Sequence, residues 1–168
     1  MKLAFEQKMM GLARIGLGWT FLWAFMDKLW GLGFTTLPEK SWLAGASPTM
    51  GFLKFATAGP LSGIFSSLAG QAWVDWLFML GLLGLGVALL LGIGMRIAGY
   101  AGALLMVLMY LASIPFYQTP AAHNPFVDEH LIYAAILLAF TRIKVGRWWG
   151  FAEKWSKTAI VKANPILE

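Results

Sequence analysis

Long apolar segments dominate the sequence and are separated by several short polar connections and one long connection. The pattern predicts four membrane spans, at about residues 9–33, 73–92, 96–115 and 126–145. A hydrocarbon core about 30 Å thick requires about 20 helical residues, so segments of this length predict helices that cross a bilayer. We therefore expect an all-α, integral membrane four-helix bundle that forms a single domain over residues 1–168.

The connection between the first two predicted spans, residues 34–72, is much longer than the others. It contains Met50–Phe55 and Leu61–Leu68, which have the composition of short amphipathic helices that lie in a membrane interface. A long connection in a small bundle usually has a function or caps the bundle. We expect a long outer loop with interfacial helices, and the basic, aromatic tail at residues 146–168 predicts another interfacial segment.

The start of the fourth predicted span combines helix-start signals with ionisable side chains. Asn124 is a favourable N-cap, and Pro125 suits the first helical position. Residues 128–130, with the sequence Asp-Glu-His, then occupy the first turns, where the helix dipole favours negative charge. Only residues 131–140 are uninterrupted apolar sequence, so these ionisable groups lie at the rim of the membrane. Ionisable groups at that depth are costly, and they are candidates for a functional site.

Composition supports the membrane interpretation. Of the 168 residues, 59% are hydrophobic and 12% are charged, whereas soluble domains have about 45–50% apolar and about 25% charged residues. The first apolar segment is too long for a cleavable signal peptide, and no small-residue cleavage site clearly follows it, so we expect no such peptide. The absence of cysteine excludes disulfides, thiolate metal sites and cysteine-ligated Fe–S clusters within this chain.

The distribution of basic residues predicts the orientation of the chain. The net charge is +5, and most Lys and Arg side chains lie beside spans, which favours contact with anionic lipid over nucleic acid. The N-terminus, the turn at Arg96 and the tail are basic, whereas the loop at 117–129 has no Lys or Arg. By the positive-inside rule both termini are cytoplasmic. Arg14 is expected to extend to the cytoplasmic surface, and the outer side then gathers ionisable residues from three helices: Asp27, Lys28, Asp75, Asp128, Glu129 and His130.

Several of these residues have more than one interpretation. Asp27 and Lys28 either anchor the end of the first span, or one of them points inward and pairs with the cluster on the fourth helix. On a regular helix Glu129, His130 and Tyr133 share an arc about 100° wide, whereas Asp128 lies about 200° from His130. The three ionisable groups therefore cannot all face the bundle axis at once.

Cofactor sites are weakly indicated. His123, Asp128 and His130 are suitable ligand types for a metal but lack a recognised spacing, so we predict no metal site. No haem, Fe–S or flavin site is evident. Trp19, Trp23 and Trp30 form an aromatic stripe that is typical of packing but is also suited to the floor of a quinone pocket.

Two motifs resemble a known family. Arg14–Gly18 followed by Phe21–Lys28 resembles the first helix of the DoxX/DoxD family, and Asn124–Tyr133 resembles the opening of its fourth helix. The resemblance implies a four-helix membrane bundle. Some members are the membrane subunit of a thiosulfate:quinone oxidoreductase, and others are linked to membrane redox and sulfur-stress complexes. This chain shows no fused second-subunit domain, so a complete oxidase would need a partner subunit.

These observations lead to one leading hypothesis. The chain is a prokaryotic inner-membrane redox protein that takes an anionic sulfur substrate such as thiosulfate in an outer polar pocket and passes electrons to quinone, a diffusible acceptor. Lys28 attracts the anion, and His130 moves protons together with Asp128 or Glu129. Asp27 belongs to the same predicted cluster, and two aromatic residues contact the quinone ring: Tyr133 and Trp23.

The alternative hypothesis is a non-enzymatic membrane scaffold or small-molecule-binding subunit of a larger complex, in which buried polar groups hold the helices together. A transporter is a third interpretation, for which broken helices at mid-membrane would be expected. The expected partners are the lipid bilayer, a partner subunit and a second copy of the chain.

Overall fold

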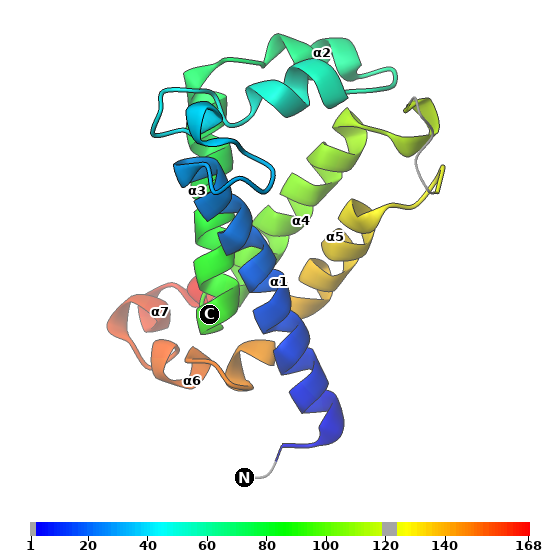
Figure 1. The fold of residues 1–168 in the computed structure, drawn as a ribbon. Coiled ribbons are helices and arrows are strands. Elements are labelled where there is room, and N and C mark those ends of the chain that lie inside the picture. Colours follow the sequence, from blue (N-terminus) through cyan, green and yellow to red (C-terminus); the bar gives the residue numbers. More distant parts are fainter. Residues whose placement is uncertain (1–2, 119–123) are drawn as a thin grey trace.

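The computed structural model describes residues 3–118 and 124–168, and within those ranges it consists of helices joined by turns and loops, without a β-strand (Figure 1). Four helices form its body: α1 (Phe5–Trp30), α3 (Ala72–Leu91), α4 (Met95–Ala112) and α5 (Glu129–Phe140). Three shorter α-helices are α2 (Ser62–Ser67), α6 (Ala152–Trp155) and α7 (Ala159–Ala163). Single helical turns, one of them a π-helix, lie at η1 (Pro38–Lys40), η2 (Phe52–Ala56), η3 (Pro115–Tyr117), η4 (Val145–Arg147) and η5 (Pro165–Leu167).

Three of the helices are long and apolar enough to cross a membrane, namely α1, α3 and α4, with 26, 20 and 18 residues. The all-helical prediction and these three candidate spans are confirmed at this level. Helix α5 is apolar but has only 12 residues, which corresponds to about 18 Å at about 1.5 Å per residue. The helical part of the predicted fourth span is therefore shorter than residues 126–145.

The helices pack as two pairs. In the described ranges the extensive contacts join α1 to α3, α4 to α5, and α3 to α4. Glycines permit these close approaches, because a Cβ atom on Gly86 would lie 2.8 Å from the backbone nitrogen of Leu22, and one on Gly102 would lie 2.9 Å from a methyl carbon of Leu137. Such small-residue contacts are typical of helix packing in membranes.

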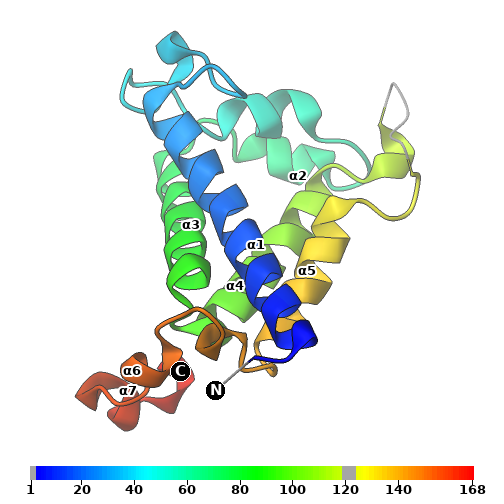
Figure 2. The ribbon, with the colours of Figure 1, turned by 60° about the horizontal axis from the view of Figure 1, so that its bottom comes forward.

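The two pairs separate toward one end of the molecule. Figures 1 and 2 show them meeting near the turn between α3 and α4 and diverging at the opposite end. There, residues 47–68, which we call the roof, extend across the top of the diverging helices and include η2 and α2. The amide of Ala58 in the roof donates a hydrogen bond of 2.8 Å to the carbonyl oxygen of Ala112, the last residue of α4. The roof is therefore attached to the pair formed by α4 and α5.

The other end carries the N-terminus and the tail, residues 146–168, which lie on the same side of the molecule (Figures 1 and 2). The sequence predicted one interfacial segment here, whereas the tail contains two short helices joined by turns. It folds back on itself through a 2.6 Å hydrogen bond from Trp155 Nε1 to the carbonyl oxygen of Leu167, and Glu168 lies 3.7 Å from Arg96.

Arg14 connects this tail to the helices. Its side chain is fully buried, so the prediction that it extends to the cytoplasmic surface is wrong. Its Nη1 donates to the carbonyl oxygens of Leu89 and Leu90, and its Nη2 donates to those of Trp148 (2.9 Å) and Trp149 (3.2 Å). One guanidinium group thus joins α1, the end of α3 and the start of the tail. Its fork of fixed N–H donors suits several carbonyl acceptors at once.

Candidate functional site

The site is built at the start of α5, which begins later than predicted. Asp128 is the N-cap, since its Oδ1 accepts hydrogen bonds from the amides of His130 (3.1 Å) and Leu131 (3.3 Å). Asn124 accepts instead from the amides of Phe126 (2.9 Å) and Val127 (3.1 Å), which forms a turn before the helix. The predictions of Asn124 as the N-cap and of a helix that begins at Pro125 are therefore wrong.

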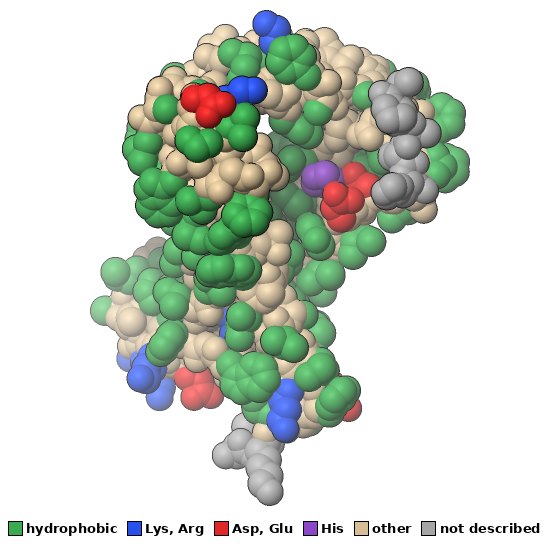
Figure 3. All heavy atoms as spheres, viewed as in Figure 1, with side chains coloured by type: hydrophobic (Ala, Val, Ile, Leu, Met, Phe, Trp, Pro, Cys, Tyr) green, Lys and Arg blue, Asp and Glu red, His purple; other side chains and the backbone are tan. Residues whose placement is uncertain are grey.

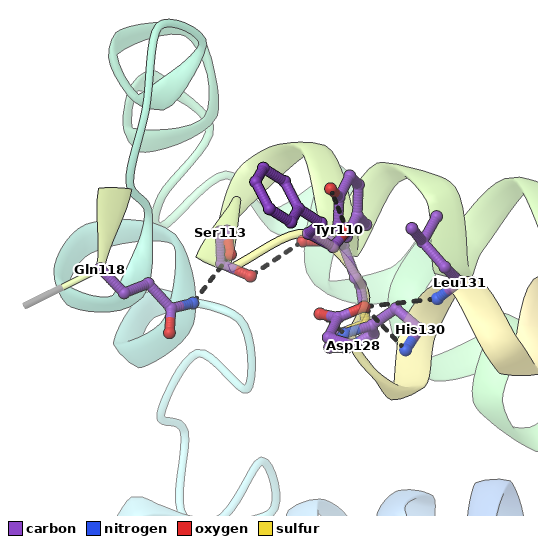
Figure 4. Close-up of polar contacts among 8 residues, drawn as sticks. Tyr110, Ser113, Gln118, Asp128, His130 and Leu131 are labelled. Atoms are coloured by element: carbon purple, nitrogen blue, oxygen red, sulfur yellow. Dashed lines mark hydrogen bonds and ion pairs between the residues drawn. The ribbon is translucent and has the colours of Figure 1, made fainter. Parts of the chain in front are cut away.

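Capping brings Asp128 to His130. The second carboxylate oxygen of Asp128, Oδ2, lies 2.8 Å from His130 Nδ1 (Figure 4). The backbone of Asp128 is extended, at φ −119° and ψ −179°, so its side chain folds back over the first turn. The angle of about 200° between Asp128 and His130 was expected for two residues of one regular helix. It does not apply, because Asp128 precedes the helix. When Asp128 holds Nδ1–H in this way, the lone pair of the neutral imidazole is on Nε2.

A cavity of about 600 Å³ separates the two helix pairs below the roof. Its walls are mainly apolar side chains from three helices and the roof, including Phe21, Phe78, Met106, Phe52 and Leu68. Figure 3 shows the hollow on one face of the molecule, with the histidine (purple) and acidic side chains (red) beside it. Ligand sites commonly combine a mostly apolar cavity of about 300–1,000 Å³ with a few polar groups.

Four predicted site residues line this cavity together: Lys28, Glu129, His130 and Tyr133. Lys28 comes from the last turn of α1, and the other three come from the first two turns of α5. Within residues 3–118 and 124–168, the ion pairs do not include Lys28 or Glu129. Both side chains are therefore available to a bound molecule, and the predicted convergence of the first and last helices occurs for these four residues.

Asp27 and Trp23 have other roles. Asp27 is buried and accepts hydrogen bonds from Thr35 N (2.9 Å), Thr35 Oγ1 (2.6 Å) and Phe34 N (3.2 Å). It thus closes the turn after α1 and does not pair with the cluster on α5. Trp23 packs edge-on against Phe34, with ring centroids 5.0 Å apart. Neither Asp27 nor Trp23 is among the residues that line the cavity.

Asp75 fastens the roof. Its Oδ1 accepts hydrogen bonds from Ser47 Oγ (2.8 Å), Thr49 Oγ1 (2.5 Å) and Thr49 N (3.3 Å). Asp27 and Asp75, which belong to different helices, therefore both hold parts of the long connection in place. Their buried carboxylates are satisfied by hydroxyl and amide donors, as buried charges require.

The cavity also contains residues that the sequence did not indicate. Thr20 and Thr49 add hydroxyl groups, and Phe65 is one of the apolar residues that the roof contributes. The amphipathic pattern of residues 50–68 predicted interfacial helices, but the pattern did not reveal that their apolar side chains cover a cavity between the spans.

No cluster of three or more potential metal ligands occurs among the residues that the structure describes. The metal alternative that included His123 lies outside those residues. A comparison of the chain with family models, curated proteins and solved structures finds no match.

Proposed function

We propose that the chain is a quinone-binding redox subunit of the DoxX/DoxD type, a four-helix bundle in a prokaryotic inner membrane with both termini cytoplasmic. The observation that carries this proposal is the shared cavity of Lys28, His130 and Tyr133. A quinone is a neutral ring with two carbonyl oxygens on opposite sides. An apolar cavity with hydrogen-bond donors on two different helices suits that shape and polarity.

Each polar residue has a role in this proposal. Lys28 donates a hydrogen bond to one quinone oxygen, and His130 lies at the second. Reduction of a quinone to a quinol takes two electrons and two protons. Nε2 of His130, whose Nδ1–H is held by Asp128, takes up a proton from the solvent side through Glu129, whose side chain is exposed, and passes it to the quinone oxygen beside it. The Lys28 ammonium gives the second proton to the other oxygen and takes a proton back from water. Tyr133 packs against the ring.

The electrons come from outside this cavity. Thiosulfate is an anion, and the lining combines one cationic residue, Lys28, with the carboxylate of Glu129 and mostly apolar side chains. Transfer of an anion into such surroundings is costly. We therefore place the oxidation of thiosulfate on a partner subunit, which delivers two electrons to the quinone held by this chain.

Quinone binding by the purified chain in detergent tests this proposal. Loss of a hydrogen bond to a charged donor costs about 1.5–3 kcal/mol, so Lys28→Met should weaken binding of a short-chain ubiquinone analogue about 10–100-fold. Lys54→Met is the matched control, because Lys54 is exposed on the roof and does not line the cavity. Equal affinity in the two variants would refute the assignment of the cavity to quinone.

A second candidate function is a scaffold subunit without redox chemistry. It is favoured by Arg14, Asp27 and Asp75, whose buried side chains bind loop or backbone groups and hold the segments of the chain together. Thiosulfate-dependent quinone reduction by membranes that contain the chain and its partner separates the two functions. The redox proposal requires that His130→Ala abolish this activity, and the scaffold function requires that it be retained.

A further inference from the structure

The roof covers the cavity at the end where the helices diverge. The roof is fastened there by Asp75, through Ser47 and Thr49, and by the hydrogen bond from Ala58 to Ala112. Apolar roof side chains line the cavity, and water reaches its edge at the exposed Glu129. A ligand that arrived through the roof would have to displace this fastened segment.

The sides of the cavity are open between the helix pairs. On the flank between α3 and α4, two wall residues are also surface residues, because Leu77 and Leu108 keep 67% and 42% of their side chains exposed. On the flank between α1 and α5, Thr20 is exposed and lines the cavity. These helices do not form an extensive contact with each other in the described ranges. Figure 3 shows the resulting hollow from this side.

In a bilayer these flanks face lipid, because α1, α3 and α4 are long and apolar enough to span it. A mouth bordered by leucine side chains is in contact with acyl chains, and an apolar molecule can pass through it without crossing water. The polar groups are Lys28, in the last turn of α1, and His130, in the first turn of α5, and these helix ends lie on the side of the roof (Figure 1). The cavity therefore has a polar end and apolar side openings.

We propose that the ligand is an amphiphile dissolved in the membrane, which enters sideways between the helix pairs and binds with its polar head at Lys28 and His130 and its hydrocarbon chain extending out into the lipid. The inference rests on the proposed function of the cavity as a ligand site. It specifies the class of ligand further, since a quinone with a long chain fits these openings and the chain remains in a lipid environment before and after binding.

Photolabelling of the full chain in lipid nanodiscs tests where the chain of the ligand lies. Two decyl-quinone probes are compared, one with a diazirine beside the ring and one with a diazirine at the end of the chain. The ring probe is expected to label peptides that contain Lys28 or His130. The chain probe is expected to label Leu77, Leu108 or Thr20, and excess unlabelled decyl-quinone should suppress this labelling but not the background at Leu80, which is exposed and does not line the cavity.

The outcomes distinguish this inference from the function on which it rests. Competable labelling of Phe52 or Phe65 by the chain probe, with the ring probe still at Lys28 or His130, would overturn lateral access and leave quinone binding intact. If the ring probe does not label the cavity, both proposals fail.

Blocking the openings gives an independent measurement. The double variant Thr20→Trp/Leu77→Trp narrows both mouths, and the control Leu12→Trp/Leu80→Trp places two tryptophans at exposed positions of α1 and α3 outside the cavity lining. Association of decyl-quinone should be at least tenfold slower for the first variant than for the second, with similar thermal unfolding. Equal association rates would contradict access through the flanks.

Discussion

Asp128 has two separable roles, because one of its carboxylate oxygens caps α5 and the other binds His130. A substitution by serine keeps the first role and removes the second. Serine is about as good an N-cap as aspartate, but its shorter side chain has one oxygen and cannot bond the amides and the imidazole together. A substitution by alanine removes both roles.

The expected magnitudes follow from these contacts. Asp128→Ser should be destabilised only by the loss of the bond to His130, whereas Asp128→Ala also loses the N-cap, so the alanine variant should be less stable than the serine variant by about 0.5–2 kcal/mol. The bond to His130 is a hydrogen bond with a charged acceptor, worth about 1.5–3 kcal/mol. If orientation of His130 depends on it, both variants should lose about 10–100-fold in quinone reduction.

Thermal unfolding in detergent, and thiosulfate-dependent quinone reduction by membranes that contain each variant and the partner subunit, test this prediction. The serine variant is decisive, since it should be more stable than the alanine variant and yet react as slowly. A serine variant with the wild-type rate would refute the role of Asp128 in holding His130. An alanine variant as stable as the serine variant would refute the capping assignment.

Three further predictions concern the framework around the site. Arg14→Met leaves four carbonyl oxygens without their donor and should destabilise the protein by at least about 1–3 kcal/mol, the cost of leaving a buried acceptor unsatisfied. Thermal unfolding against the exposed control Arg142→Met measures this; equal stability would contradict the buried role of Arg14. Asp75→Ala removes the carboxylate that accepts hydrogen bonds from Ser47 and Thr49 in the roof. Backbone hydrogen exchange in residues 47–58 should then become about 10–100-fold faster, and unchanged exchange would show that other contacts hold the roof. Gly86→Val would place its Cβ within 3 Å of the α1 backbone and should lower the unfolding temperature, whereas Gly84→Ala, with open space around it, should not.

The sequence predicted the first three long helices well because apolar length is a local property. It failed at the start of α5 because two residues there can act as caps. Asn124 and Asp128 both favour positions that precede a helix, and the side chain of Asn124 binds the amides of its own turn instead. Such local competition between turn and helix is decided by the surrounding packing.

The site was predictable in part for a geometric reason. Orientation rules brought the end of the first helix to the start of the last, and Lys28 and His130 indeed line one cavity. Trp23 and Asp27 are four residues apart and therefore share one face of α1. Thr20, Ala24 and Lys28 have the same spacing and share another face. Helical periodicity separates these two faces, but it does not reveal which face borders the cavity.

The role of Arg14 could not be predicted for a different reason. Its acceptors are main-chain carbonyl oxygens, which every residue has, and they lie far away in the sequence. No pattern of residue types marks the end of α3 or the start of the tail as its partner. Similarly, Thr49 is recognisable as a partner of Asp75 only after the roof has folded over the helices.

The Arg14 contacts also have a consequence for how the chain is made. Arg14 lies near the beginning of α1, and its partners at Trp148 and Trp149 are synthesised 134 and 135 residues later. Throughout that interval the nascent protein carries a cation in its first apolar helix that lacks two of its final acceptors. Chains that stop before Trp148 lack these two acceptors permanently, so α1 is fully satisfied only in a chain that has been completed through Trp149.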